Sequence, residues 1–140
     1  MVMARMRSGF AVFGDTQHLP GYSLLLCDDA SVNHLTDLNR TRRGEFLLDM
    51  TLIGEAIQSV CAKDGLRRIN YEVLGNALEW LHGHVHPRYE WEPPERAEWP
   101  VWSYPPEERE GPTVAYQAGL HGALREKIAI ELHRRMASAY

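Results

Sequence analysis

The sequence lacks the features that mark secreted, membrane-spanning and nucleic-acid-binding proteins. It has only two cysteines, Cys27 and Cys61, without paired spacing, so neither a disulfide framework nor a zinc ribbon is indicated. No segment approaches the roughly 20 apolar residues that a membrane helix needs. The net charge of −4 argues against general binding to a nucleic-acid backbone, which needs a basic footprint. We therefore expect a cytoplasmic protein that binds neither membranes nor nucleic-acid polymers.

The length of the chain favours one domain. With 140 residues, of which 44% are hydrophobic, it can bury a proper core but cannot form a second full domain. We predict a single domain over residues 1–140, with its core at about 10–90. Residues 91–140 would add an irregular arm rich in proline and tryptophan and a C-terminal helix. Tryptophans in such an arm usually cover a core or an interface.

Apolar alternation and turn residues predict several strands. Residues 10–13 and 22–27 are short β-prone runs, separated by the turn former Pro20-Gly21, and are expected to pair in antiparallel fashion. Residues 69–73 alternate apolar and polar side chains, as a half-buried strand requires. The turn at residues 74–78 would bring a histidine-rich strand back beside them.

Helical spacing predicts two long helices and one short helical turn at residues 32–38. The first helix should begin near Asn39, a favourable N-cap, and run to about Lys63. Its apolar face is expected to contain Phe46, Met50, Ile53, Ile57 and Val60. The second helix should span about residues 113–136. Its apolar stripe would consist of Leu120, Leu124, Ile128 and Leu132.

The most unusual stretch is residues 81–89, where His82, His84 and His86 lie two residues apart. In an extended strand all three imidazoles project from one face. Such a row can bind a transition metal, with Glu72 or Glu90 as a further ligand. A histidine with an unprotonated nitrogen can equally act as a nucleophile or general base. Spacing alone does not choose between these chemistries.

The context of the row is more specific. Residues 70–89, with Gly75-Asn76 before the histidines and Pro87-Arg88-Tyr89 after them, closely resemble the histidine triad superfamily of nucleotide hydrolases and transferases. The bacterial members that resemble diadenosine tetraphosphate hydrolases look most similar, and the likeness spans about residues 10–89. It implies an α+β fold, with an antiparallel sheet of about five strands, a long helix packed on it and an additional C-terminal helix. It also implies a homodimer.

The family motif fixes the register of the triad. It reads His-apolar-His-apolar-His-apolar-apolar and is often followed by Pro-Arg. Counting back from Pro87 makes His84 the third position, His82 the middle position and Trp80 the first. His86 then occupies an apolar position. Many members also have histidine after the Pro-Gly turn, where this chain has Tyr22.

The resemblance implies a two-step reaction. The middle histidine, His82, would attack the α-phosphorus of a nucleoside polyphosphate such as diadenosine tetraphosphate, or of a phosphoramidate, and water would hydrolyse the nucleotidyl-histidine. A backbone carbonyl would hold its other ring nitrogen. His84 and the Asn76 amide would donate hydrogen bonds to phosphate oxygens, and Gly75 would let the backbone approach the ligand. We expect no metal and no cofactor held by the protein, although Mg²⁺ can accompany the substrate.

Other residues have two interpretations each. Asp15 could accept hydrogen bonds from ribose hydroxyls or only stabilise a turn, and Asn76 could only cap a turn. His86 could assist proton transfer, or reach solvent if the chain bends at Pro87. His18 could replace the histidine missing at Tyr22, and the ring or indole N–H of Trp80 could orient the active imidazoles.

Two further functions stay open. Because Trp80 and Tyr22 replace family histidines, the protein could bind nucleotides with little turnover. Less strongly indicated is a metal site built from His82, His84 and His86.

Overall fold

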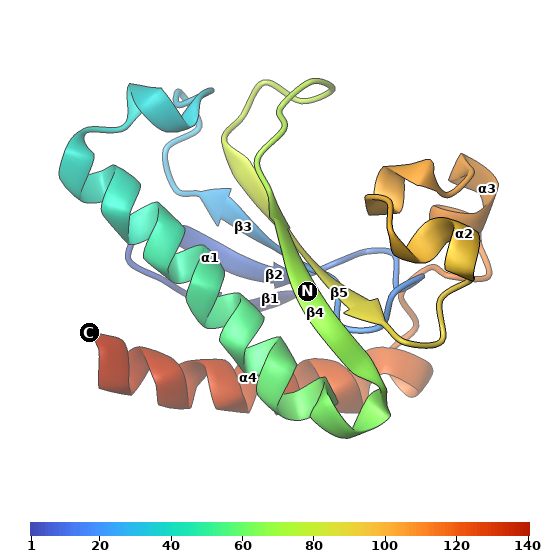
Figure 1. Ribbon diagram of the computed structural model, residues 1–140. Helices are drawn as coiled ribbons and strands as arrows, with labels where there is room; N and C mark the ends of the chain where they lie inside the picture. The colour runs from blue at the N-terminus through green and yellow to red at the C-terminus, as the bar shows by residue number, and fades with distance from the viewer.

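The computed structural model describes all 140 residues and centres on an antiparallel sheet of five strands in the order β1-β2-β3-β5-β4 (Figure 1). The strands are β1 (Val2–Arg5), β2 (Gly9–Phe13), β3 (Ser23–Cys27), β4 (Leu66–Glu72) and β5 (His82–Tyr89). The four strands predicted by position are all present. Strand β1 was not predicted, because a four-residue edge strand with one β-branched residue gives little periodic signal.

Helix α1 (Arg40–Cys61) covers one face of the sheet. Asn39 is its N-cap, as predicted, and the Asn39 Oδ1 atom accepts the Arg42 N–H at 3.0 Å. A 3₁₀ turn, η2 (Ala62–Asp64), and Gly65 at φ 81° end the helix. The predicted apolar face is buried, except that Val60 is only partly buried. A Cβ on Gly83 would lie 2.5 Å from the Met50 sulfur, so this glycine lets α1 approach β5 closely.

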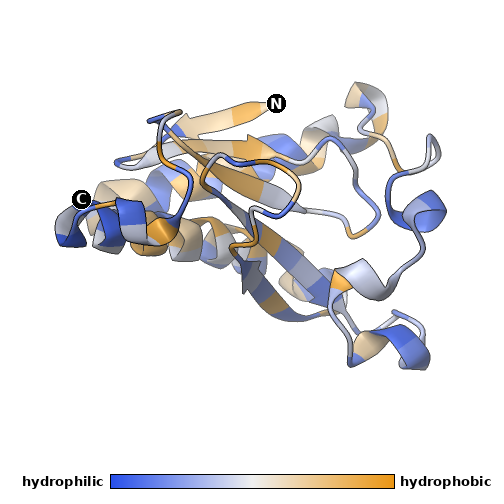
Figure 2. Ribbon diagram, turned by 90° about the horizontal axis from the view of Figure 1, so that it is seen from above, coloured by the Kyte–Doolittle hydropathy of each residue, from blue (hydrophilic) through white to orange (hydrophobic).

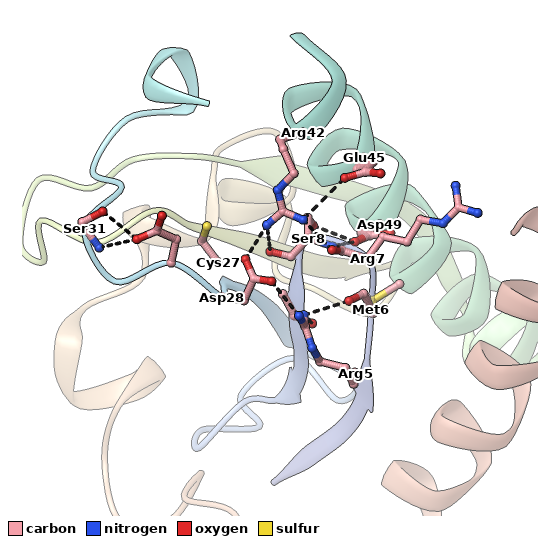
Figure 3. A network of polar contacts seen from close by, with 12 residues as sticks. Arg5, Met6, Arg7, Ser8, Cys27, Asp28, Ser31, Arg42, Glu45 and Asp49 are labelled. Carbon is pink, nitrogen blue, oxygen red and sulfur yellow. Dashed lines mark hydrogen bonds and ion pairs between the residues drawn. The ribbon is translucent and has the colours of Figure 1, made fainter. Parts of the chain in front are cut away.

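Arginines at the start of α1 tie the helix to the loops around it (Figure 3). Arg42 pairs with Asp28 and donates to the Arg7 carbonyl at 2.6 Å. Arg43 donates to three carbonyls around the short helix η1 (Leu35–Asp37), which lies in the predicted helical turn. These bonds hold basic side chains at a helix end where the dipole alone would disfavour them.

Helix α4 (Ala118–Ala139) packs on α1 and near β1. It alternates hydrophobic and hydrophilic segments toward the C terminus in Figure 2, as an amphipathic helix does. Ile128 and Leu132 are fully buried, as predicted, and Leu124 is partly buried. The prediction was wrong for Leu120, which is 67% exposed because the helix begins only at Ala118 and its first turn lies outside the core. No helix has both the length and the apolar character needed to cross a bilayer.

Residues 91–117 form an arm that covers part of the other sheet face. The arm contains the short helices α2 (Pro94–Ala97), η3 (Val101–Ser103) and α3 (Pro106–Arg109). In Figure 1, α2 and α3 lie on the side of β5 away from α1. Trp102 lies against His84 and His86 of β5, with ring-centroid distances of 5.3 and 5.6 Å. Trp99 is 62% exposed, and Trp91 is 54% exposed although its ring stacks on the buried Tyr89 ring at 4.9 Å.

A buried ion pair anchors this arm. The Arg88 guanidinium donates to the Glu92 carboxylate at 2.8–3.1 Å, and both side chains are almost completely buried. Arg88 also donates to Asn70 Oδ1 on β4 and to backbone carbonyls at both ends of the loop Arg96–Trp99. Tyr104 donates its hydroxyl to Glu92 at 2.9 Å. The charges are therefore satisfied without solvent.

Replacing Glu92 should destabilise the fold strongly. A Glu92→Gln variant leaves the buried Arg88 charge without its partner, and we expect a loss of about 3 kcal/mol in the free energy of unfolding. Urea denaturation measures this loss. The control is Glu131→Gln, which removes the surface ion pairs of Glu131 with Arg134 and Arg135 and should cost less than about 1 kcal/mol. Equal losses in the two variants would contradict the anchoring role of the buried pair.

Candidate functional site

Strand β5 places its even-numbered residues on the face opposite α1. His82, His84 and His86 are 9%, 9% and 4% exposed, and their side chains share this face as predicted. Neighbouring ring centroids are 4.9 Å and 5.7 Å apart. The strand stays regular through Pro87, which pairs with Ile69, so His86 is buried and does not reach solvent.

His82 is held in one tautomer by the backbone. Its Nδ1 atom lies 2.5 Å from the Trp80 carbonyl oxygen. Because a carbonyl only accepts hydrogen bonds, the proton is on Nδ1, and neutral His82 has its lone pair on Nε2. The Trp80 indole donates instead to the Cys27 carbonyl at 3.2 Å. The support expected from the ring or indole of Trp80 therefore comes from its backbone carbonyl.

His84 is held by Tyr22, whose oxygen lies 2.8 Å from the His84 Nδ1 atom. Burial, followed by the neighbouring charges of Asp15 and Glu72, raises the pKa of Tyr22, so its hydroxyl keeps its proton. Burial and then the charges of His86 and His82 lower the pKa of His84 to about 4. Because the Tyr22 hydroxyl makes no other hydrogen bond, its buried proton has a partner only when it is donated to Nδ1, and this arrangement puts the proton of neutral His84 on Nε2.

The two rings therefore present opposite functions. His82 presents a free lone pair, and His84 beside it presents an N–H donor. Nothing in the motif identified Tyr22 as the group that orients His84. The motif showed only that a histidine was missing there.

His86 extends the cluster. Its ring stacks on Tyr22 at 4.3 Å with an interplanar angle of 2°, and its Nδ1 atom lies 3.5 Å from the Glu72 carboxylate. Trp102 donates its indole N–H to Glu72 at 2.8 Å. Burial alone would raise the pKa of Glu72, but the neighbouring His86 and the hydrogen bond from Trp102 outweigh it and lower that pKa. Glu72 was named from the sequence as a possible neighbour of the row, as a metal ligand, whereas no sequence signal placed Trp102 here.

A pocket of about 300 Å³ opens at the His86 end of the row. This His86-side pocket is lined by His86 with Asp15, Thr16, His18, Tyr22, Trp102 and Arg109, among others. Asp15 is exposed at the pocket, and its side chain makes no hydrogen bond. His18 has a buried Nε2 atom without a partner, and burial lowers its pKa. The structure thus brings the predicted residues Asp15, His18 and His86 together.

A second pocket, of about 250 Å³, opens at the other end of the row. This His82-side pocket is lined by His82 with His34, Thr36, Val73, Leu74, Gly75 and Trp80, among others. Gly75 has φ 74°, a conformation that its missing side chain allows. Asn76 is exposed on the same loop and lines neither pocket, and its contact with a phosphate stays a prediction.

No group of three or more His, Cys, Asp or Glu side chains is arranged to hold a metal ion. Two of the three imidazoles make other contacts, since His82 bonds a carbonyl and His84 bonds Tyr22. The geometry of the row therefore does not favour the metal-site alternative.

Comparison with known proteins identifies the fold through solved structures and not through sequence matches. No family model and no curated protein sequence matches the chain. A histidine triad protein from Marinobacter aquaeolei superposes with a TM-score of 0.77 at 19% identity, covering 96% of this chain and 89% of that one. The chain has the histidine triad fold. A histidine triad protein from Sinorhizobium meliloti gives 0.76 at 18% identity, covering 94% and 88%. One from Bradyrhizobium japonicum gives 0.77 at 15% identity, covering 94% and 90%.

The predicted α+β architecture is thereby confirmed, including the five strands, the long helix on the sheet and the additional C-terminal helix. In this histidine triad fold the histidine strand lies between β3 and β4 rather than at an edge. Neighbouring strands therefore flank the row on both sides.

The lowered pKa of His84 should make stability depend on pH. Its folded pKa of about 4 lies below the ordinary value of 6.5, so the unfolded state binds more protons between these values. Unfolding free energy should fall as pH drops from 6.5 to 4, by on the order of 2 kcal/mol from this group. Urea denaturation of the wild type and His84→Gln across this range measures the contribution as a difference in slope. Parallel curves would contradict it.

Proposed function

We propose that the protein is a nucleotide hydrolase or nucleotidyl transferase with His82 as its nucleophile. The proposed substrates have a phosphoanhydride or phosphoramidate at an α-phosphate, as in diadenosine tetraphosphate or adenosine phosphoramidate. The observation that carries the proposal is the contact between His82 Nδ1 and the Trp80 carbonyl, which leaves Nε2 free to attack. The histidine triad fold and the likeness of residues 70–89 support it.

In the first step, the Nε2 lone pair of His82 forms a bond to the α-phosphorus while the bond to the leaving group breaks. A leaving phosphate departs as the anion, and a leaving amine takes a proton from solvent as it departs. The His84 Nε2–H donates a hydrogen bond to a phosphate oxygen, where negative charge must be stabilised. Water then attacks the same phosphorus, which releases a nucleoside monophosphate and restores neutral His82. The low pKa of His84 keeps this donor uncharged across the neutral range.

The nucleoside of the attacked phosphate is assigned to the His86-side pocket. Tyr22 and Trp102 supply aromatic walls, and the unpaired Asp15 carboxylate can accept hydrogen bonds from ribose hydroxyls. The Arg109 guanidinium lies over the Trp102 ring at 5.1 Å and pairs with Glu110 in the same pocket, so it would exchange that partner for phosphate oxygens on binding. Mg²⁺ would enter with the substrate.

A second candidate is a nucleotide-binding protein with little turnover. It is favoured by one observation: the side chain at the first triad position, Trp80, contacts the Cys27 carbonyl rather than an imidazole. Our proposal differs because a carbonyl at position 80 orients His82 equally well whichever side chain that residue carries.

Removing the proposed nucleophile tests catalysis directly. The His82→Ala variant should release adenine nucleotides from diadenosine tetraphosphate and adenosine phosphoramidate at least about a thousandfold more slowly than the wild type. Chromatography follows products with and without Mg²⁺, and intact mass detects the nucleotidyl adduct. His133→Ala, on the exposed part of α4, is the control and should match the wild type. Nucleotide binding by a wild-type protein that forms neither product nor adduct would establish the second candidate instead.

Tyr22 should affect kcat more than KM. Tyr22→Phe keeps the ring that stacks on His86 but removes the hydroxyl that fixes the His84 tautomer, so we expect kcat to fall about tenfold with little change in KM. The matched variant Tyr22→His restores a hydrogen-bonding ring and should recover part of the activity. A Phe variant with wild-type kcat would show that Tyr22 does not position His84.

A further inference from the structure

The backbone of Tyr22 is fixed by three hydrogen bonds. Its N–H donates to the Leu19 carbonyl at 3.1 Å, and its carbonyl accepts the Gly14 N–H at 2.9 Å and the Gln17 side-chain amide at 3.0 Å. Only the side-chain torsions of Tyr22 can then move the hydroxyl that contacts His84. Because this hydroxyl lies at the far end of the ring, a small rotation would take it out of hydrogen-bonding range of the His84 Nδ1 atom.

Two contacts restrict the side-chain torsions of Tyr22. A Cβ on Gly14 would lie 2.4 Å from the Tyr22 Cδ1 atom, so the missing side chain lets one edge of the ring approach the backbone closely. The His86 ring stacks on Tyr22 at 4.3 Å with an interplanar angle of 2°. His84, which receives the hydrogen bond, lies farther away, with its ring centroid 6.1 Å from that of Tyr22. Gly14 and His86 therefore hold the ring that carries the hydroxyl.

His86 is itself held firmly enough to position another ring. Its side chain is almost completely buried, and its backbone pairs with Asn70 of β4. Its Nδ1 atom lies 3.5 Å from the Glu72 carboxylate, and the Trp102 ring stands at 87° to the imidazole at 5.6 Å. Trp102 and Glu72 are joined by a hydrogen bond of 2.8 Å. The packing around His86 therefore leaves its ring little freedom to rotate.

The contacts of His86 favour a positioning role over proton transfer. A group that transfers a proton needs a nitrogen within hydrogen-bonding reach of its partner. The His86 ring is nearly parallel to those of Tyr22 and His84, so it presents its face to them rather than a nitrogen. Its buried Nδ1 atom has no hydrogen-bond partner, and the 3.5 Å contact with Glu72 is longer than an ordinary hydrogen bond. His86 thus offers Tyr22 a flat surface.

From these contacts we propose that His86 is a positioning residue, whose flat ring holds Tyr22 so that the Tyr22 hydroxyl donates to His84 Nδ1. His86 acts only through Tyr22 and does not touch the reacting atoms. Position 86 is apolar in the histidine triad motif and position 22 is a histidine in many members, so the two departures from the motif contact each other and operate as a pair. The proposal concerns the free protein, and only its expected effect on kcat rests on the proposed function.

Two substitutions separate the flat ring of His86 from its nitrogens. His86→Phe keeps a flat ring without nitrogen, whereas His86→Gln keeps polar atoms without a ring. Nitrogen-15 NMR of the free proteins then observes His84. In the wild type and in His86→Phe, His84 Nδ1 should accept a hydrogen bond. In His86→Gln, Nδ1 should lose the shift that this bond produces, as it should in Tyr22→Phe. A wild-type His84 spectrum in His86→Gln, or the loss of this bond in His86→Phe, would overturn the proposal.

Turnover of diadenosine tetraphosphate gives a second measurement. His86→Gln should lower kcat about tenfold with a smaller change in KM, and His86→Phe should stay within about threefold of the wild type. Because His86 acts through the Tyr22 hydroxyl, the double variant Tyr22→Phe/His86→Gln should be no slower than Tyr22→Phe alone. Losses that multiply in the double variant, or equal losses in His86→Phe and His86→Gln, would contradict the positioning role.

The control is His133→Gln, the same change on the exposed part of α4, which should leave the His84 spectrum and kcat unchanged. Urea denaturation shows whether each variant is folded. If the larger phenylalanine prevents folding, the His84 spectrum of His86→Gln decides the proposal. A wild type without turnover, together with the expected spectral change in His86→Gln, would reject the proposed catalysis and leave the positioning of Tyr22 standing.

Discussion

The alternation of side chains along β5 is the constraint on which the rest of the structure depends. Odd-numbered residues such as Gly83 face α1 and the core, so His82, His84, His86 and Arg88 must share the opposite face. Polar side chains on a strand in the middle of a sheet need hydrogen-bonding or ionic partners and a segment of chain that covers them. Arg88 provides both, because its buried pair with Glu92 anchors the arm that places Trp102 over the histidines. Strand β5 thus positions the histidines, and Arg88 at its end anchors the arm that covers them.

Burial then determines the chemistry of the histidines. An imidazolium shielded from water and close to other imidazoles is unfavourable, which is why the pKa of His84 falls to about 4. Two neutral imidazoles can act as nucleophile and hydrogen-bond donor only when each has a defined tautomer. A backbone carbonyl fixes His82 and a tyrosine hydroxyl fixes His84, so a nucleophile and a donor lie side by side. Neither support requires a histidine at position 80 or 22, which explains how the site can form with Trp80 and Tyr22.

The sequence was sufficient to predict the helices and strands whose side-chain pattern repeats along the chain. Alternation identified the histidine face, and the N-cap Asn39 and the apolar spacing located α1. Long-range contacts were not accessible in this way. Tyr22 and His84 are 62 residues apart, and no local pattern indicates their bond. Strand β1 was too short to show a repeating apolar pattern. The placement of Trp102 depends on the distant Arg88–Glu92 pair. Asn76 matched the family motif, yet its side chain lies outside both pockets.

The central claim is that His84 is neutral and that the neutral forms of His82 and His84 are opposite tautomers. Nitrogen-15 NMR of the histidine side chains, assigned by single substitutions and recorded near pH 6, measures this directly. The structure predicts a proton on Nδ1 with a free Nε2 for His82, and a proton on Nε2 with a hydrogen-bonded Nδ1 for His84. A cationic His84 at this pH, or the same tautomer in both rings, would contradict the account.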